Sequence, residues 1–243
     1  MSRIQTFYWH RQPAIDAALL REFADSLGPG KLVVDVGAGY DPWPYATEFV
    51  DREAWPALAG KKVHVLDVEL DRLPYADKSV DFLYCRHCIE DLHNPTLLLR
   101  EMNRVAKAGY IETPSPIAEF CRGSNSPDCR LRGCPHHFWI CWGETGTLTL
   151  LPKSQFIQTA TVSDDIETAI VGALAKPDRW HTQFGWRERL NFRVLKHRTD
   201  FDFCDHPSYL KLLQRAFFAS GIALAAKTEP SEQRPQFCQT SVQ

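Results

Sequence analysis

Long apolar runs are missing from this sequence. The longest uninterrupted ones, such as that around Leu98, are far too short to cross a bilayer. The first ten residues also lack the apolar segment of a secretion signal. Lys plus Arg number 28 and Asp plus Glu number 30, so the formal net charge of −2 gives no attraction to bulk nucleic acid or to acidic membranes. We therefore expect a cytoplasmic protein that binds neither nucleic acid nor a membrane.

Internal repeats and low-complexity tracts are absent as well. The 243 residues are 44% hydrophobic and 24% charged, which is typical of a globular domain with a sizeable core. We expect a single domain over residues 1–243. Its parts would be a core at about 13–116, an insertion or lid at about 115–142, a C-terminal embellishment at about 143–226 and a polar tail at 227–243.

Short β-branched runs alternate with helical patterns in the first half of the chain. Strands are expected at 31–36, 46–50, 62–66, 80–85 and 110–112, and helices at 13–27 and 96–106. This alternation predicts an α/β fold, Rossmann-like and doubly wound, with a mostly parallel sheet. The Cys/His-rich segment 115–142 is expected to be irregular, and the C-terminal third to form a lid. That third is expected to contain strands at 146–151 and 190–196 and helices at 164–175 and 208–219.

The first expected strand carries Asp35 near its end and runs into a Gly-x-Gly turn at Gly37 to Gly39. Glycines let a ligand approach the backbone closely, and the amides of such a turn can donate hydrogen bonds. A dinucleotide fingerprint would need a third glycine where Pro42 stands, and no Gly-Lys-Ser/Thr follows as in a P-loop. An acid before a two-glycine turn suits a positively charged ligand better than a pyrophosphate.

The segment from Asp35 to Gly39 resembles the first motif of class I S-adenosylmethionine-dependent methyltransferases of type 11. The resemblance extends in order over about 13–116, through acids after the second and third strands, a Leu-Pro-aromatic turn at Leu73 to Tyr75 and an Asp-Phe pair at Asp81 and Phe82. It implies methyl transfer from S-adenosylmethionine, with S-adenosylhomocysteine as the other product. The expected acceptor is a small molecule.

The resemblance also implies roles for individual residues. The methionine part of the cofactor would be held by Asp35, Gly37, Ala38 and Gly39. Asp51 would bind the ribose hydroxyls, Asp67 with Val68 would bind the adenine, and Cys85 would face the cofactor. The distance from Asp35 to Asp51 is shorter than is usual in the family, so the helix between them must be abbreviated.

Three residues are candidates for substrate contact or proton removal, namely His87, His137 and Glu112. Histidine is the side chain whose unperturbed pKa is nearest to neutrality, which suits a general base. His87 follows the fourth expected strand. Alternatively, His136 and His137 pack the insertion against the sheet, and Glu112 binds loop backbone.

The eight cysteines leave several interpretations open. Cys85 and Cys88 form a Cys-x-x-Cys pair, and Cys129 with Cys134 forms a second pair that could complete a zinc site, with His136 or Cys141 as substitute ligands. The thiols could instead bind a soft substrate or be free. We expect no metal.

Two other functional classes stay open. One is methylation of a macromolecule, either RNA or protein. The absence of a basic stripe weighs against RNA. The other is a non-catalytic, metal-stabilised module that keeps the fold. A homodimer is compatible with the sequence.

Overall fold

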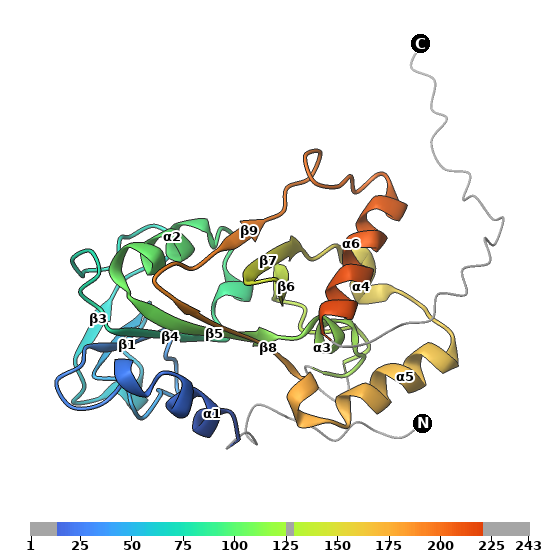
Figure 1. The fold of residues 1–243 in the computed structure, drawn as a ribbon. Coiled ribbons are helices and arrows are strands. Elements are labelled where there is room, and N and C mark those ends of the chain that lie inside the picture. The colour runs from blue at the N-terminus through green and yellow to red at the C-terminus, as the bar shows by residue number, and fades with distance from the viewer. Residues whose placement is uncertain (1–13, 125–128, 221–243) are drawn as a thin grey trace, which may run out of the picture.

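The computed structural model describes residues 14–124 and 129–220 of the chain. Its centre is a six-stranded sheet in the order β3-β2-β1-β4-β5-β8 (Figure 1). The strands are β1 (Val33–Val36), β2 (Glu48–Asp51), β3 (Val63–Val65), β4 (Phe82–Arg86), β5 (Ala108–Pro114) and β8 (His181–Arg187). The first five run parallel to their neighbours, and β8 closes the edge antiparallel to β5.

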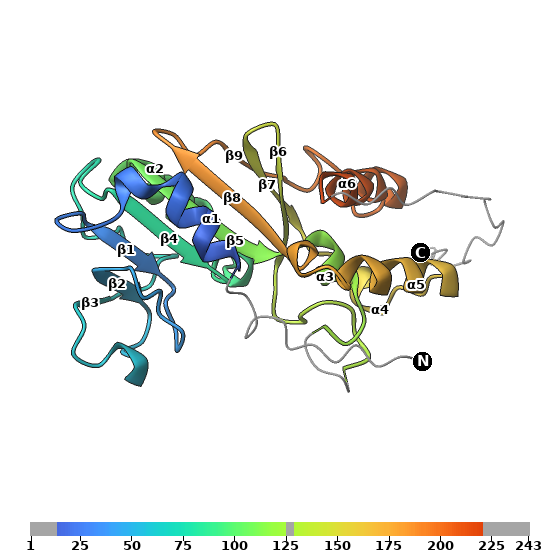
Figure 2. The same ribbon diagram turned by 60° about the horizontal axis from the view of Figure 1, so that its bottom comes forward.

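The two faces of this sheet are covered by different elements. Helix α1 (Ala14–Glu22) lies on one face and α2 (Thr96–Val105) on the other (Figure 2). Because side chains alternate along a strand, Val34 and Val36 pack in the cluster that includes α2 residues such as Leu99. Val33 packs instead with α1, in the cluster that contains Leu19 and Phe23. The α/β class with a mostly parallel sheet is confirmed.

A second, smaller sheet lies on the α2 side. It consists of β6 (Trp139–Glu144), β7 (Thr147–Pro152) and β9 (Phe192–Val194), in that order. Cys141, Leu148 and Leu150 from it join the same buried cluster as α2 and the main sheet. The C-terminal third therefore completes the core of the main sheet, which the parallel strands alone would leave partly uncovered.

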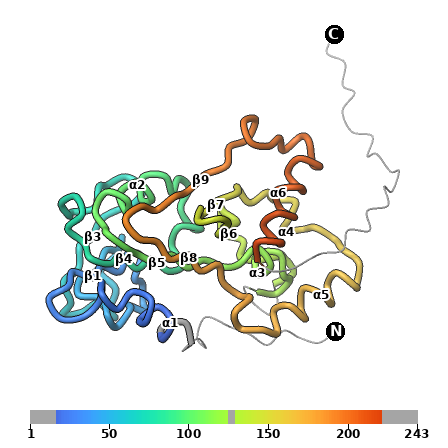
Figure 3. The backbone as a smooth tube through the Cα atoms, viewed as in Figure 1, coloured from blue at the N-terminus to red at the C-terminus, as the bar shows by residue number. Residues whose placement is uncertain are grey.

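The remaining helices gather beyond the carboxyl end of β5, as the tube in Figure 3 shows. They are α3 (Pro116–Phe120), α4 (Gln155–Thr159), α5 (Asp164–Leu174) and α6 (His206–Ala219). Short 3₁₀ turns are η2 (Ala24–Ser26), η3 (Pro56–Leu58), η4 (Ile89–Asp91) and η5 (Pro177–Arg179). These helices share a hydrophobic cluster of their own, with Trp142, Trp180 and Tyr209 at less than 4% exposure.

The expectation of an irregular segment over 115–142 is wrong at both ends. Ser115 begins α3, because its Oγ accepts a hydrogen bond from the amide of Ala118 at 3.1 Å and Pro116 occupies the first helical position. At the other end, Trp139 already belongs to β6. The sequence also did not predict β8 or α4.

Some of the predicted features lie outside the described residues. The predicted polar tail, 227–243, lies outside the described residues, as does Pro13 at the start of the first predicted helix. Within 14–124 and 129–220, no helix combines the length and apolar character that a membrane crossing requires. The division into one domain with a lid stays a prediction.

Candidate functional site

The glycine turn lies at the carboxyl end of β1, between β2 and the segment that follows β4. The amide of Gly37 donates to the carbonyl of Val50 at 2.8 Å. Gly37 has a φ of +75°, and a Cβ built on it would lie 2.8 Å from the Cβ and Sγ of Cys88. A residue with a side chain would therefore be strained twice at this position, by its backbone conformation and by steric overlap. The turn needs glycine here.

Asp35 lies under this turn with 1% of its surface exposed. Its Oδ2 accepts a hydrogen bond from the amide of Trp43 at 2.8 Å. Burial raises the pKa of Asp35 to about 7, the Trp43 hydrogen bond opposes this, and the nearby Asp51 carboxylate adds to it. A cationic group bound at the turn would stabilise the ionised form of Asp35, which the protein alone leaves poorly compensated.

Asp51 ends β2 and is tied to the same turn. Its Oδ2 accepts from the amide of Gly39 at 2.8 Å, and its Oδ1 accepts from Trp55 Nε1 at 3.0 Å. Asp67 follows β3, and its Oδ1 accepts from the amide of Glu69 at 2.9 Å. The structure thus brings Asp35, Asp51 and the turn together, whereas contact of Asp51 with ribose and of Asp67 and Val68 with adenine stay predictions.

Cys85 points away from Asp35. Asp35 and Tyr84 lie on the α1 face, while Cys85 packs in the cluster on the α2 face and is 1% exposed. Its neighbour Cys88, not Cys85, is the thiol that contacts the glycine turn. Contact of Cys85 with a cofactor stays a prediction.

Glu112 lies on the α1 face of β5 and is almost completely buried. Its Oε1 accepts from Arg86 Nε at 2.8 Å, and its Oε2 accepts from the hydroxyl of Tyr110 at 2.7 Å. Burial alone would raise the pKa of Glu112, but the charges of the surrounding side chains, Arg86 among them, outweigh it and lower the pKa. Glu112 is therefore an anion that positions its neighbours.

His87 follows β4 directly and has an unusual backbone conformation for a non-glycine residue, with a φ of +48°. Its amide donates to the carbonyl of Glu112 at 2.9 Å. Its Nδ1 lies 3.1 Å from Oε1 of Glu90, a carboxylate with no exposed surface. Its Nε2 is buried and has no hydrogen-bond partner among the described residues. Glu90 therefore fixes the ring and leaves Nε2 able to accept a proton.

His181, at the start of β8, completes this group, and the sequence did not point to it. Its ring centroid is 5.1 Å from that of His87, and its Nε2 is 4.0 Å from Glu112 Oε1. Burial lowers the pKa of His181 to about 3, which keeps it neutral. His181 also lines a cavity of about 310 Å³ with Trp142, Arg179 and Thr182. Because it belongs to a strand that was not predicted, no signal in the sequence placed it here.

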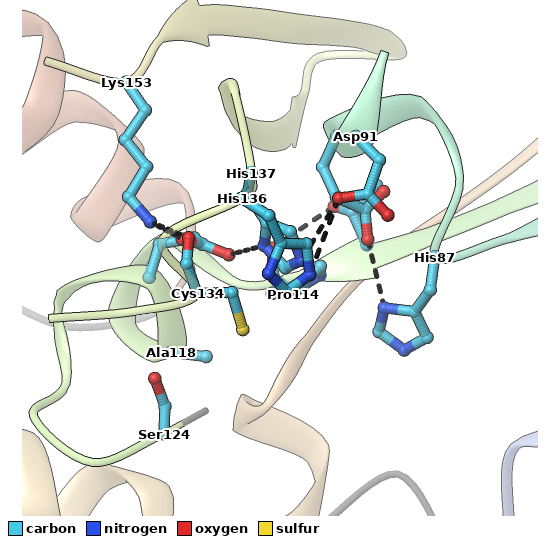
Figure 4. A network of polar contacts seen from close by, with 12 residues as sticks. His87, Asp91, Pro114, Ala118, Ser124, Cys134, His136, His137 and Lys153 are labelled. Atoms are coloured by element: carbon cyan, nitrogen blue, oxygen red, sulfur yellow. Dashed lines mark hydrogen bonds and ion pairs between the residues drawn. The ribbon is translucent and has the colours of Figure 1, made fainter. Parts of the chain in front are cut away.

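His137 lies at the other side of the polar network that Figure 4 draws, next to Glu119 and Lys153. Its Nδ1 donates to Oε1 of Glu119, whose Oε2 accepts from Lys153 Nζ, both at 2.5 Å. Burial would lower the pKa of His137, but the Glu119 carboxylate reverses the effect and raises it to about 11. A histidine held protonated in this way is a poor general base at neutral pH, although a contact with substrate stays a prediction.

The two cysteine pairs do not form one metal site in the described part of the chain. None of the ligand groups found there contains Cys85, Cys88 or Cys129, and the seven cysteines at positions up to 204 are free thiols. Cys134 lies near Glu119 and His137 instead. The zinc site built on two cysteine pairs is therefore wrong for these residues, while Cys238 lies outside the described ranges.

Comparison with known proteins adds an independent finding. Residues 18–111 match the sequence model of a family described as a methyltransferase domain. No functionally curated protein matches the chain. The matched range contains the glycine turn, Asp35, Asp51, Asp67 and His87.

Similar solved structures include SAM-dependent methyltransferases from Aquifex aeolicus and Thermotoga maritima. They are 26% and 21% identical, have TM-scores of 0.32 and 0.33, and match over 41% and 45% of this chain. A third is phosphoethanolamine N-methyltransferase 2 from Haemonchus contortus in complex with S-adenosyl-L-methionine, at 19% identity, 43% coverage of this chain and a TM-score of 0.33. The matches span 64%, 63% and 29% of those chains, respectively, which is less than two thirds of each.

The family match and the glycine turn fall on the same strands. The described sheet supplies a buried acid, a turn that requires glycine, and an acid at the end of the next strand. Residues 18–111 therefore resemble a methyltransferase domain both in sequence and in the glycine turn at the end of β1.

Proposed function

We propose that this protein transfers the methyl group of S-adenosylmethionine to a small-molecule acceptor and that His87 removes the acceptor's proton. The observation that carries the proposal is the state of the His87 ring. One nitrogen is anchored on buried Glu90, and the other is buried with no hydrogen-bond partner among the described residues, 3.8 Å from Glu112 Oε1. A fixed imidazole with a bare nitrogen is the arrangement of a general base.

The position of His87 supports the same role. Cys88, the next residue, contacts Gly37 of the turn, so the imidazole is held beside the region where the cofactor is expected. Asp35 with Gly37, Ala38 and Gly39 would hold the methionine part, Asp51 the ribose, and Asp67 with Val68 the adenine. Cys85 is kept as a predicted cofactor contact only. The bound cofactor supplies an electrophilic methyl group on a sulfonium.

The chemistry then needs only positioning and proton transfer. A lone pair on the acceptor atom forms the new bond to carbon while the carbon–sulfur bond breaks, and the proton on the acceptor passes to His87 Nε2. The products are the methylated acceptor, S-adenosylhomocysteine and one proton. Glu112, Arg86 and neutral His181 provide polar groups that orient the acceptor beside His87.

Burial of the site favours a small acceptor. Glu112 and His181 are both less than 10% exposed, and His181 lines a half-open pocket of about 310 Å³, at the lower end of the volumes typical of small-molecule pockets. A polymer would need an open groove. The cytoplasmic location, the absence of nucleic-acid and membrane partners, and the homodimer stay predictions.

Transfer of labelled methyl groups tests the proposal. The protein is incubated with methyl-labelled S-adenosylmethionine and a cell extract that has been divided by filtration into small molecules and macromolecules. We expect label in the small-molecule fraction. Label in precipitated RNA or protein would show a macromolecular acceptor, and label in neither, from protein that binds S-adenosylhomocysteine, would contradict catalysis.

A further inference from the structure

Three side chains converge at the surface next to the His87 network, from two segments far apart in the sequence. Asp91 ends η4, and His136 with His137 precedes β6. Asp91 Oδ1 lies 3.7 Å from His136 Nε2 and 3.6 Å from His137 Nε2. All three donor atoms lie within 4.8 Å of one another. Figure 4 shows both imidazoles directed toward the same carboxylate.

Backbone contacts hold the two segments together. The amide of Phe138 donates to the carbonyl of Glu90 at 2.7 Å, and Trp139 Nε1 donates to the carbonyl of Leu92 at 2.6 Å. These bonds lie immediately beside the converging side chains. The approach of the two histidines to Asp91 is thus fixed by the fold and does not depend on the charges alone.

The ring of His137 is oriented by Glu119. Its Nδ1 donates to Glu119, which is itself held by Lys153, so its Nε2 faces Asp91. A metal-ligating histidine usually donates a hydrogen bond from its other ring nitrogen to a carboxylate. This bond fixes the ring and makes the ligating nitrogen a better electron donor to the metal. A metal ion at Nε2 would replace the proton on that nitrogen, and the Glu119 carboxylate would stabilise the positive charge of the metal-bound ring.

The local charge is negative. Three carboxylates, those of Glu90, Asp91 and Glu119, face two cations, Lys153 and the protonated ring of His137. Glu90 is fully buried, and its Oε2 has no hydrogen-bond partner among the described residues. A bound cation would offset this charge.

We propose that Asp91, His136 and His137 bind one divalent transition-metal ion, with Zn²⁺ as the best-suited ion. Two imidazole nitrogens and a carboxylate oxygen are ligands that zinc accepts, and a site with three protein ligands keeps its fourth position open. The side chains of His136 and Asp91 are 61% and 42% exposed, which gives the ion a path of entry. The two separations from Asp91 Oδ1, 3.7 and 3.6 Å, exceed the roughly 3.3 Å between tetrahedral ligands by a few tenths of an ångström, and the two histidine nitrogens lie within 4.8 Å of each other.

A second group of similar composition is less suited to a metal. His87, Glu112 and His181 also bring two imidazoles and a carboxylate together. There, however, Arg86 Nε already donates to the Glu112 oxygen that faces both rings, and its positive charge would repel a metal ion. We therefore assign the metal to Asp91, His136 and His137, and leave the His87 group to the methyl acceptor.

Metal binding can be measured without any assay of activity. Protein prepared without a histidine tag and stripped with a chelator is titrated with Zn²⁺ by calorimetry and with Co²⁺ by absorption spectroscopy. We expect one ion per chain. His136→Ala and Asp91→Asn should each weaken binding by at least about tenfold, the lower end of the loss seen when even an outer partner is removed. Both residues are exposed, so the variants should fold.

His93→Ala is the matched control. His93 is also exposed and also faces a carboxylate, with its Nδ1 3.7 Å from Glu69 Oε2, but no second histidine joins this pair. Its loss should leave zinc binding unchanged. Unchanged affinity in His136→Ala and Asp91→Asn, absence of stoichiometric binding, or equal weakening in His93→Ala would each overturn the proposal.

The cysteine alternative is tested in the same titration. If Cys134 were a ligand together with Glu119 and His137, bound Co²⁺ would show a sulfur-to-cobalt charge-transfer band and Cys134→Ser would abolish it. We expect neither. Because none of these readouts uses S-adenosylmethionine, failure of the metal site and failure of the proposed function are separate results.

Discussion

His87 combines a strained backbone with a fixed ring. Its φ of +48° is a conformation in which an ordinary side chain is disfavoured, and such strain tends to persist where function requires it. The sequence indicated His87 because it follows a predicted strand, but it could not indicate Glu90 as the anchoring partner. That contact depends on the turn η4, which folds the chain back within three residues.

Replacement of His87 by glycine removes the imidazole without adding backbone strain, so it tests the loss of the base alone. Since glycine adopts a positive φ without steric strain, His87→Gly should remain folded, yet lose about 10²- to 10⁴-fold in kcat because the base is gone. Added imidazole should restore part of the rate. Steady-state kinetics with and without imidazole measure both effects.

Glu188→Gly is the matched control for this variant. Glu188 also has a positive φ, +59°, and it lies on the surface. Its replacement should leave kcat unchanged. A His87→Gly enzyme with less than a tenfold loss of kcat, or one that imidazole does not affect, would argue against His87 as the base.

We expect Asp35 to make the free energy of unfolding depend on pH. Its folded pKa of about 7 lies above the ordinary 3.8, so the folded state binds the Asp35 proton more tightly than the unfolded chain does. The resulting stability is fully present below pH 3.8 and is lost as the pH rises toward 7. Asp35→Asn, which keeps an acceptor for the Trp43 amide, should abolish this loss.

The two proteins are compared by chemical denaturation at a series of pH values. Between about pH 4 and 7, the free energy of unfolding of Asp35→Asn should rise relative to the wild type by up to about 4 kcal/mol. A constant difference across this range would show that Asp35 stays ionised in the folded protein.

At the scale of elements, the sequence predicted the parallel strands well and the C-terminal third poorly. The runs that became β1 and β4 are apolar and buried on both faces, which gives a clear signal. Strand β8 lies at the edge of the sheet, alternates buried with exposed residues and contains Gly185, so its signal is weak. The Gly-x-Gly turn was recognisable because its backbone requires glycine.

Gly37→Ala tests that requirement. A side chain there meets both the unfavourable φ, worth roughly 1–2 kcal/mol, and Cys88 at 2.8 Å. Gly30 has nearly the same φ, +77°, but nothing within 4 Å of a built Cβ. We expect Gly37→Ala to unfold at a lower denaturant concentration than Gly30→Ala. Equal unfolding midpoints would mean that Cys88 moves aside with no loss in the free energy of unfolding.

Arg132 connects several helices through contacts that the sequence could not reveal. Arginine side chains in a loop-rich segment are mostly exposed to solvent. Arg132 is instead completely buried, donates to the carbonyls of Phe120 and Ala160, and pairs with Glu167 of α5. It joins α3, α4 and α5 into one unit, which depends on contacts distant in sequence.

Arg132→Met should therefore destabilise the protein by about 1–3 kcal/mol, because the carbonyl of Phe120 loses its Arg132 donor, while Glu167 and the Ala160 carbonyl keep Arg122. Arg130→Met is the control, since Arg130 is exposed and its loss should change stability little. Denaturant unfolding monitored by tryptophan fluorescence gives both values. Equal stability of the two variants would show that the buried guanidinium is dispensable.

At the scale of the whole molecule, a methyltransferase domain is joined to a C-terminal third that covers one face of its sheet and supplies His181 to the candidate site. The sequence predicted the methyltransferase domain, because its motifs follow from local patterns, while the cofactor contacts and the role of His87 stay predictions. It could not predict the grouping of His181 with Glu112 or of His136 and His137 with Asp91. Those groupings arise only when β8 and β6 pack against the first half of the chain.

Calorimetric titration with S-adenosylhomocysteine measures whether the glycine turn is the cofactor site. We expect saturable binding of one molecule per chain, retained in Gly30→Ala and weakened in Gly37→Ala, since only the second change fills the turn. A folded wild-type protein that shows no binding, or a Gly37→Ala variant that binds as tightly as the wild type, would contradict this expectation.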